Sequence, residues 1–426
     1  MKGAWRLRVW SVLVVLSTLA TICVSIPGFA AAPVEIVWSF WGDPGELPPN
    51  YEVIKAFEAA HPDIKIVVQH SPWSSYFDKI QTQMAGQTAP DVMFLNNIPS
   101  YASRGVLENL DPYIKESGFD VSGFYPELMR TFMYRGHVYG FPRDNDTTVL
   151  YYNKSLFDAA GVKYPDETWR WSNFLEAAKK LTKTDARGRV IQYGVALEFN
   201  KYPLFVYQNG GSVVDDPLEP TKFLLNEPKA VEGIQFMADL INVHKVAPSF
   251  VDMKQMGDTT QLFLTGRVAM VMTNAARIPT FKDANFAWDV APLPAGPTGI
   301  RANSMGGAGY VMSSTSKHKK EAWEFLKFLC GREGQTIFAS TGVAVPAYRS
   351  PETAAAFLAD KTPAHKNVFL TETGQGRLFP FFSGWAEIST TLVDPTLDRV
   401  FIGETSAKAA LDEIADDVQK MIDSRR

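Results

Sequence analysis

The sequence predicts an α/β protein with two lobes, and three observations support this fold class. The chain has 426 residues, whereas a domain usually contains about 100–200 residues, so two domains with separate cores are expected. Strand-like and helix-like segments alternate before residue 140, and the alternation returns after residue 150. Between the two halves lies the polar, turn-rich segment 140–146, which we interpret as a crossover between the lobes.

The first half of the chain has the pattern of parallel β–α–β units. Its expected strands are short apolar runs, and its expected helices carry apolar residues at helical spacing. In chain order these elements are the strand 35–40, the helix 50–60, the strand 64–68, the helix 76–85 and the strand 92–95. The same alternation of strands and helices predicts a sheet covered by helices in the first lobe.

The second half repeats this pattern and then returns to the first lobe. Ser172 is a plausible N-cap for a helix that reaches Leu181, and the strand 190–197 follows it. Further on, a strand is expected at 288–294, a proline- and glycine-rich linker at 294–299, and a glycine-rich strand at 306–312. The helix after that strand has Ala322, Phe325, Leu326 and Leu329 on one face.

These elements define the expected domains. The first lobe is expected to contain residues 31–145 and 303–344, and the second lobe residues 146–302 and 345–426. Both lobes are therefore discontinuous in the sequence, because the chain crosses between them more than once.

Residues 1–30 differ from the rest of the chain and are interpreted as a signal peptide. Lys2, Arg6 and Arg8 precede an apolar run, which ends near small residues that fit cleavage after Ala30. Two alternatives are an uncleaved membrane anchor, since a span needs about 20 apolar residues, and lipid attachment at Cys23. The residues before Cys23 do not fit a lipid-attachment signal, so export across the cytoplasmic membrane is expected, to the periplasm or the cell surface.

Charge and cysteine content exclude some classes of protein. Removal of residues 1–30 takes away three basic residues and no acidic ones, so the formal net charge changes from −4 to −7. An acidic protein is a poor general nucleic-acid binder, because such binding needs Lys and Arg to neutralise phosphates. The remaining chain has one cysteine, Cys330, so it forms no internal disulfide, and this thiol is expected to be a small core residue.

Four segments of the chain resemble the sugar-type solute-binding proteins of ABC importers, family 1, which includes the maltose-binding protein. They are Ala89-Pro90-Asp91-Val92, Gly136 to Asn153, Leu264 to Met272, and Gly307 to Leu329, and they stand in the order and spacing of that family. The resemblance covers nearly all of the chain after the signal segment. It implies a bilobal periplasmic-binding-protein-like fold, crossover hinge strands, a ligand cleft between the lobes, and closure of the lobes on a sugar.

A sugar offers hydroxyl groups and flat C–H patches, so its site needs carboxylates, amides and aromatic rings. On the first lobe such residues follow the expected strands at their carboxyl ends, where open α/β sheets hold ligands. Aromatic residues there could instead cap the sheet or anchor a helix, and asparagines could simply serve a turn. The residues expected to contact the ligand are Trp41, Asp43, Trp73, Tyr76, Asn96 and Asn97.

The crossover segment places three charges within four residues, namely Arg143, Asp144 and Asp146. A carboxylate that accepts a sugar hydroxyl forms a charge-assisted hydrogen bond, worth about 1.5–3 kcal/mol, so these acids are expected to set specificity. The alternative is that arginine and aspartate pair with one another and stiffen the hinge.

The second lobe and the returning strand supply the other expected contacts. Asn274 and Arg277 follow the apolar strand 268–272, and the resemblance places this segment at the cleft. Gly306 and Gly307 would let the backbone approach a ligand closely, although they could equally be structural. In the aromatic run of Phe381, Phe382 and Trp385, the expected stacking residue is Trp385.

An enzymatic function and an anionic ligand are the alternatives to this interpretation. The motifs of lipases, zinc proteases and nucleotide-binding enzymes are not found, and the six histidines are scattered without metal-ligand spacing. Asp144 and Asp146 could still act as the two carboxylates of a glycoside hydrolase. Arg143 and Arg277 keep an anionic ligand open, such as a sugar phosphate or a uronic acid. We expect a monomeric binding protein, not an enzyme, that takes a small carbohydrate to the transmembrane permease subunits of an ABC transporter and needs no cofactor or metal.

Overall fold

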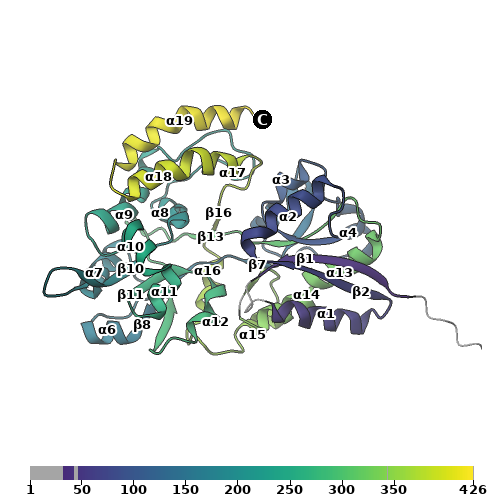
Figure 1. Ribbon diagram of the computed structural model, residues 1–426, viewed down its shortest axis with the longest axis horizontal. Helices are drawn as coiled ribbons and strands as arrows, with labels where there is room; N and C mark the ends of the chain where they lie inside the picture. The colour runs from purple at the N-terminus through teal and green to yellow at the C-terminus, as the bar shows by residue number, and fades with distance from the viewer. Residues whose placement is uncertain (1–31, 43–46, 343, 426) are drawn as a thin grey trace, which may run out of the picture.

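The computed structural model describes residues 32–42, 47–342 and 344–425. They form two lobes that lie side by side along the longest axis of the molecule (Figure 1). Within the described residues, each lobe is built around one five-stranded sheet with helices against it, so the predicted bilobal α/β fold is confirmed. The expected signal segment, its cleavage site and Cys23 lie outside the described residues.

The sheet of the first lobe has the strand order β2-β1-β3-β14-β6. The pairs β1–β2 and β1–β3 are parallel, as the β–α–β pattern predicts, whereas β14 runs antiparallel to both β3 and β6. The elements of this lobe are β1 (Val34–Trp41), α1 (Pro48–Ala60), β2 (Ile64–Ser71), α2 (Trp73–Ala85), β3 (Val92–Leu95), α3 (Ile98–Ala102), α4 (Asp111–Ser117), α5 (Pro126–Arg130), β4 (Met133–Tyr134), β5 (His137–Val138), β6 (Gly140–Pro142), β14 (Gly309–Met312), α13 (Lys319–Cys330) and α14 (Arg332–Ser340).

Both faces of this sheet are buried, which explains the continuous apolar run of β3. Val92 and Phe94 belong to a core cluster that includes residues of α1 and α13, while Met93 and Leu95 belong to a second cluster with residues of α2. Successive side chains of a strand point to opposite faces, so helices on both faces require apolar residues at every position.

The second lobe repeats this design around a sheet of order β12-β8-β11-β10-β9. In β8, Val149 and Tyr151 enter one core cluster, and Leu150 and Tyr152 enter another. The elements are β8 (Val149–Asn153), α6 (Lys154–Ala160), α7 (Trp171–Leu181), β9 (Lys183–Thr184), β10 (Val190–Ala196), η2 (Phe199–Lys201), α8 (Tyr202–Gln208), α9 (Pro228–Asn242), α10 (Phe250–Met256), α11 (Thr259–Leu264), β11 (Val268–Thr273), η3 (Ala275–Arg277), α12 (Ile278–Phe281), β12 (Trp288–Ala291), α17 (Trp385–Ile388), η4 (Ser389–Val393), α18 (Asp394–Phe401) and α19 (Ala407–Asp423).

Three connections join the lobes. The first crossing segment, residues 143–148, leads from β6 to β8 and contains β7 (Asp144–Asn145). The second crossing segment, residues 292–308, leads from β12 to β14 and contains β13 (Asn303–Met305). The third leads from α14 through β15 (Val345–Pro346), which pairs with β7, to α15 (Pro351–Phe357), α16 (Val368–Thr373) and β16 (Gly376–Leu378), which pairs with β13. The expected domain limits fall in or beside these connections and remain predictions.

Two local predictions were wrong. The helix α7 begins at Trp171, with Arg170 rather than Ser172 at the N-cap position, because the Arg170 N–H donates to the Asn173 side chain and Trp171 N–H donates to Ala295 O. The glycine-rich strand begins at Gly309, not at Gly306, because the preceding glycines belong to the second crossing segment.

None of the helices in the described part of the chain has the length and apolar character that a membrane span requires.

Candidate ligand-binding site

A cavity of about 340 Å³ lies where the crossing segments meet the two lobes. Both lobes and all three connections contribute to its wall, so its shape depends on how the lobes are placed relative to each other. The lining residues are Trp41, Trp73, Asn96, Arg143, Asp144, Asn145, Asp146, Asn274, Ala275, Ala276, Ser304, Met305, Gly306, Gly307, Ala308, Ala344, Val345, Phe379 and Phe381.

The structure brings together most of the residues that the sequence pointed to. Those that line the cavity are Trp41, Trp73, Asn96, Arg143, Asp144, Asp146, Asn274, Gly306 and Gly307. They come from segments far apart in the chain, and they include the carboxylate, amide and aromatic groups that a polyhydroxylated ligand requires.

Other predicted contacts lie elsewhere. Tyr76 is fully buried in the core of the first lobe, and its hydroxyl donates to Ser39 O at 3.0 Å. Asn97 adopts a left-handed conformation with φ of 52° just before α3, which fits the turn alternative. Arg277 is exposed at the end of η3, and Trp385 packs in the second lobe with its ring centroid 5.8 Å from that of Phe382. Asp43 lies outside the described residues.

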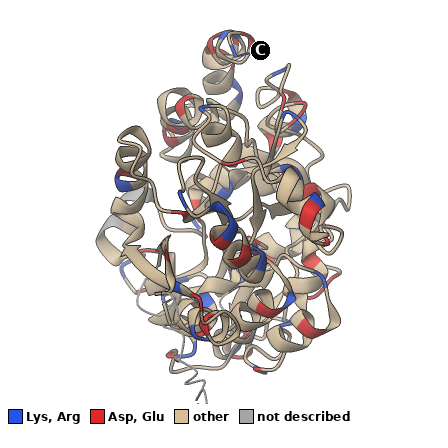
Figure 2. Cartoon of the chain, turned by 90° about the vertical axis from the view of Figure 1, so that its right-hand side faces the viewer, with Lys and Arg blue, Asp and Glu red and all other residues tan. Residues whose placement is uncertain are grey.

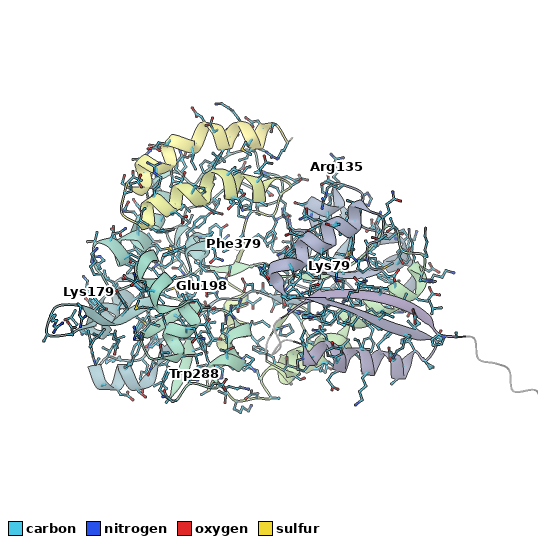
Figure 3. All side chains as sticks on the ribbon, viewed as in Figure 1. Lys79, Arg135, Lys179, Glu198, Trp288 and Phe379 are labelled. Atoms are coloured by element: carbon cyan, nitrogen blue, oxygen red, sulfur yellow. The ribbon has the colours of Figure 1, made fainter. Side chains whose placement is uncertain are left out.

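Several cavity residues were missed by the sequence reasoning. Phe379 and Phe381 line the wall from the aromatic run in which Trp385 was favoured, and Phe379 lies toward the space between the lobes in Figure 3. Their spacing of two residues, after the short strand β16, was a usable signal for side chains on one face. Asn145 and Ser304 gave no comparable signal, because single polar residues are common in turns and linkers.

The first lobe presents an aromatic wall to the cavity. The Trp41 ring stacks on Phe94 with centroids 4.1 Å apart, and Trp73 meets Trp41 edge-on at 5.0 Å. Trp73 remains 53% exposed, so its ring is available to a ligand. Both tryptophans thus hold apolar faces beside the amide of Asn96, a combination suited to the C–H patches and hydroxyls of a sugar.

Arg143 and Asp144 form an ion pair at the start of the first crossing segment. Arg143 Nε donates to Asp144 Oδ2 at 2.8 Å, and the guanidinium lies 4.1 Å from the centroid of the Phe94 ring. The other carboxylate oxygen of Asp144 accepts from Ala308 N–H at 3.3 Å. A Cβ atom on Gly307 would lie 2.4 Å from Asp144 O, so this close approach of two crossing segments requires glycine. Arg143 and Asp144 therefore pair with each other, which was the alternative to direct contact with a ligand.

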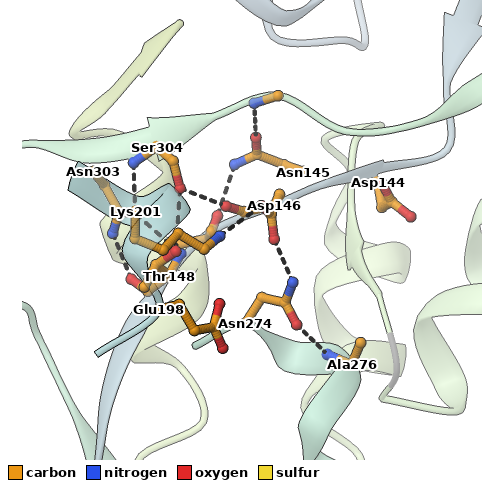
Figure 4. A network of polar contacts seen from close by, with 12 residues as sticks. Asp144, Asn145, Asp146, Thr148, Glu198, Lys201, Asn274, Ala276, Asn303 and Ser304 are labelled. Atoms are coloured by element: carbon orange, nitrogen blue, oxygen red, sulfur yellow. Dashed lines mark hydrogen bonds and ion pairs between the residues drawn. The ribbon is translucent and has the colours of Figure 1, made fainter. Parts of the chain in front are cut away.

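Asp146 is held instead by the second lobe (Figure 4). Its Oδ2 accepts from Lys201 Nζ at 2.9 Å, and its Oδ1 accepts from Asn274 Nδ2 at 2.5 Å. Burial acts to raise the pKa of Asp146, but the ammonium of Lys201, the amide of Asn274 and the charge of Arg277 outweigh it and lower the pKa below its ordinary value. Asp146 is therefore an anionic hydrogen-bond acceptor at neutral pH.

The same network ties the first and second crossing segments together. Ser304 Oγ donates to Asp146 O at 2.9 Å, and Asp146 N–H donates to Gly306 O at 2.8 Å. Asn303 accepts from Thr148 N–H at 3.0 Å and donates to Thr148 O at 2.6 Å. These hydrogen bonds fix the backbone around Asp146, so its carboxylate has a defined direction relative to the cavity.

The electrostatic balance of the cavity is simple. Arg143 is the single cationic side chain among the described lining residues, and Asp144 neutralises it. In the parts of the chain that the structure covers, no group of three or more His, Cys, Asp and Glu residues could hold a metal ion. What the lining offers is hydrogen bonding through amides, hydroxyls and carboxylates, together with stacking.

A second, larger cavity of about 630 Å³ adjoins this site, also between the lobes. The two meet at one stretch of chain, because Phe381 lines the first cavity while Phe382 and Ser383 line the second. Beside it, Arg130 of the first lobe pairs with Asp216 of the second, with Arg130 Nη2 and Asp216 Oδ2 at 3.2 Å. The space between the lobes therefore continues beyond the first cavity.

Two α/β lobes, three connections and a polar, aromatic cavity between them define a two-lobed ligand-binding protein. Comparison with known sequences agrees with this class. The profile of the bacterial extracellular solute-binding protein family matches residues 47–336, and the chain belongs to that family.

Individual proteins show the same similarity. An ABC substrate-binding protein of Listeria monocytogenes, solved in complex with cycloalternan, is 31% identical, covers 92% of this chain and 99% of its own, and gives a TM-score of 0.83. The maltose-bound MalE3 of T. maritima shares the fold with a TM-score of 0.76 at 24% identity, covering 91% of this chain and 100% of its own. The galactooligosaccharide-binding protein of Bacillus subtilis (strain 168) is 23% identical over 90% of this chain and 89% of its own.

Proposed function

We propose that the protein captures a neutral oligosaccharide between its lobes and presents it to the transmembrane permease of an ABC importer. The observation that carries this proposal is the composition of the cavity wall. Aromatic rings of both lobes stand beside Asn96, Asn274, Ser304 and the anionic Asp146. Charged acceptors and amides pair with sugar hydroxyls, and rings cover the C–H faces.

The charges of the wall favour a neutral ligand over a sugar phosphate or a uronic acid. The Arg143 guanidinium is already paired with Asp144, and Lys201 with Asp146. Arg277 is exposed and is not part of the wall. An added phosphate or carboxylate would meet two aspartates whose cations are engaged, and so would be bound with a net electrostatic penalty.

A glycoside hydrolase is a poorer fit to the same residues. Such an enzyme needs one carboxyl group that stays protonated until it donates its proton to the leaving group. The lowered pKa of Asp146 opposes that role, because Lys201 stabilises the ionised form. Asp146 and its neighbours are suited to holding hydroxyls in place, which is what a binding protein does.

The proposed ligand is an oligosaccharide rather than a single sugar for two reasons. A second cavity of about 630 Å³ lies between the lobes, and its lining residues Phe382 and Ser383 directly follow Phe381 of the first. Relatives whose names specify their ligands bind galactooligosaccharide and arabinooligosaccharide, and the structure from Listeria monocytogenes holds cycloalternan.

Export and partners belong to the same proposal. The family consists of extracellular solute-binding proteins, and residues 1–30 have the pattern of a signal peptide. We propose that the mature chain works as a monomer outside the cytoplasmic membrane and docks on the permease when its lobes are closed. Figure 2 shows positions of Lys and Arg interspersed with positions of Asp and Glu along the ribbon, and the acidic net charge of the chain also disfavours a nucleic-acid partner.

Thermal-shift measurements test the proposal, because a ligand that binds the folded state raises the melting temperature by mass action. The panel consists of maltotriose, a galactooligosaccharide, an arabinooligosaccharide and cycloalternan, with glucose 6-phosphate and galacturonic acid as anionic members. We expect a neutral oligosaccharide to stabilise the protein without being cleaved, and its binding to change little with salt. Stabilisation by the anionic members alone, or release of shorter sugars, would contradict the proposal.

A further inference from the structure

Lys201 is a buried cation of the second lobe that pairs with Asp146 but does not line the cavity itself. It ends η2, where the chain enters α8 of the second lobe, and it is 7% exposed. Its Nζ donates to Asp146 Oδ2 at 2.9 Å across a sequence separation of 55 residues. Removal of a buried ammonium from water is costly unless a counterion compensates it, so a lysine at this position needs a partner such as Asp146.

We propose that Lys201 is a positioning residue for ligand binding, which holds the Asp146 carboxylate in its ionised form and in one orientation toward the cavity. This inference rests on the proposed function and names a residue that acts behind the ligand contacts. Lys201 donates to Asp146 Oδ2, and Asn274 donates to Asp146 Oδ1, so each carboxylate oxygen has one donor within the protein. Each oxygen has a further lone pair, and the Asp146 side chain is 35% exposed, so capacity to accept a ligand hydroxyl remains.

The geometry also joins Asp146 to the second lobe. Asp146 lies in the first crossing segment, yet both of its side-chain donors belong to the second lobe. The same segment contacts the first lobe at Arg143, whose guanidinium lies 4.1 Å from the centroid of the Phe94 ring in β3. A rotation of the lobes about this segment would therefore carry Asp146 with Lys201 and Asn274, and the ligand contact would stay intact.

The charged groups around Asp146 determine how its contact responds to pH. Lys201 and Arg277 face it from the second lobe, Glu198 faces Lys201, and Asp144 on the same segment is paired with Arg143. Burial acts to lower the pKa of Lys201, but Asp146 and Glu198 raise it, so the ammonium persists at neutral pH. Because the pKa of Asp146 is lowered, its carboxylate stays charged from about pH 8 down to about pH 5.

Loss of the Lys201 charge should make binding sensitive to pH. In Lys201→Met the partial burial of Asp146 persists while the main stabilising cation is gone, so the pKa of Asp146 rises. Protonation then removes an anionic acceptor as the pH falls. We expect wild-type affinity to change less than about twofold between about pH 8 and pH 5, and the affinity of Lys201→Met to fall by more than about twofold toward the acid end of that range.

Isothermal titration calorimetry on the full mature protein makes this test, with the panel oligosaccharide that gives the largest thermal shift as the probe. Lys201→Arg, which keeps the charge, should restore most of the wild-type pH profile. The double variant D146N/K201M should bind weakly at all pH values, since it has no carboxylate to titrate. Lys319→Met is the matched control, because Lys319 pairs with Glu108 at 2.7 Å in the first lobe, away from the cavity.

The outcomes separate the two proposals. If no panel member binds the wild-type protein, the proposed function fails. If the probe binds and Lys201→Met keeps both the wild-type affinity and the flat pH profile, the role of Lys201 is refuted while the proposed function stands. If Lys201→Met does not fold, the wild-type profile and Lys201→Arg decide the question, since a loss of wild-type affinity centred between about pH 4 and pH 6 would overturn the inference.

Discussion

Side chains of the cavity and of the core differ in what they contribute, and two phenylalanines make the difference measurable. Phe381 lines the cavity, whereas Phe174 of α7 is fully buried in the core of the second lobe and lines neither cavity. We expect Phe381→Ala to weaken oligosaccharide binding by about tenfold with a small change in melting temperature, because it removes a stacking surface. Phe174→Ala should instead cost about 3–5 kcal/mol of stability. Calorimetric titration and thermal unfolding of both variants test this, and equal affinity losses would contradict it.

A second residue-scale prediction concerns the ionised carboxylate. Asp146→Asn keeps the size of the side chain but leaves Lys201 buried without its counterion. We expect weaker oligosaccharide binding and a loss of stability of about 1–3 kcal/mol, because the buried Lys201 ammonium loses its main counterion while the partial exposure of position 146 and the charge of Glu198 moderate the loss. Denaturant unfolding measures this loss, and an unchanged unfolding midpoint would show that the pair does not stabilise the protein.

Which residues reach the cavity could be predicted only in part. Arg143, Asp144 and Asp146 stood out because charges are unusual in a short segment between apolar strands. In the sequence, Tyr76 could not be distinguished from a ligand-binding aromatic residue. In the structure it anchors its helix in the core, and its hydroxyl donates to Ser39 O. Lys201 carried no signal, because its partner lies 55 residues away and no local pattern predicts such a pairing.

At the scale of elements, the crossing segments depend on close backbone contact. Gly307 lies where a Cβ atom would come within 2.4 Å of Asp144 O and 2.8 Å of Asp144 Oδ1. We expect Gly307→Ala to destabilise the protein by about 1–3 kcal/mol and to weaken ligand binding, because the two segments must separate. Gly118→Ala is a control for the loss of glycine, since nothing lies within 4 Å of its Cβ position although its φ is 64°. Equal effects of the two changes on binding would refute this prediction.

The alternation of strands and helices was predictable because the two kinds of element have different apolar patterns. Buried strands are short continuous apolar runs, whereas amphipathic helices carry apolar residues at every third or fourth position. The parallel strands β1, β2 and β3 follow directly from that alternation. The antiparallel placement of β14 between β3 and β6 does not, since it depends on where the chain re-enters the first lobe after a long excursion. The start of α7 was missed for a similar reason, because Ala295, more than a hundred residues away, accepts from its first N–H.

For the whole molecule, the Arg130–Asp216 ion pair predicts how easily the lobes separate. Both side chains are 42% exposed, so the pair contributes at most about 1 kcal/mol. We expect Asp216→Asn to increase the radius of gyration of the ligand-free protein slightly, and saturating oligosaccharide to return it to the ligand-bound wild-type value. Small-angle X-ray scattering of both proteins measures this change. A radius that is the same with and without ligand in both proteins would contradict closure of the lobes.

Cys330 gives this molecule a practical property. The thiol is the sole cysteine after the expected signal segment, it is fully buried at the end of α13, and burial raises its pKa well above the ordinary value. A thiol in that state is nearly inert toward maleimides, because the thiolate is the reacting species. Pairs of dyes can therefore be attached to cysteines introduced on the two lobes without first removing the native one. The natural sequence is already a background for watching single molecules open and close.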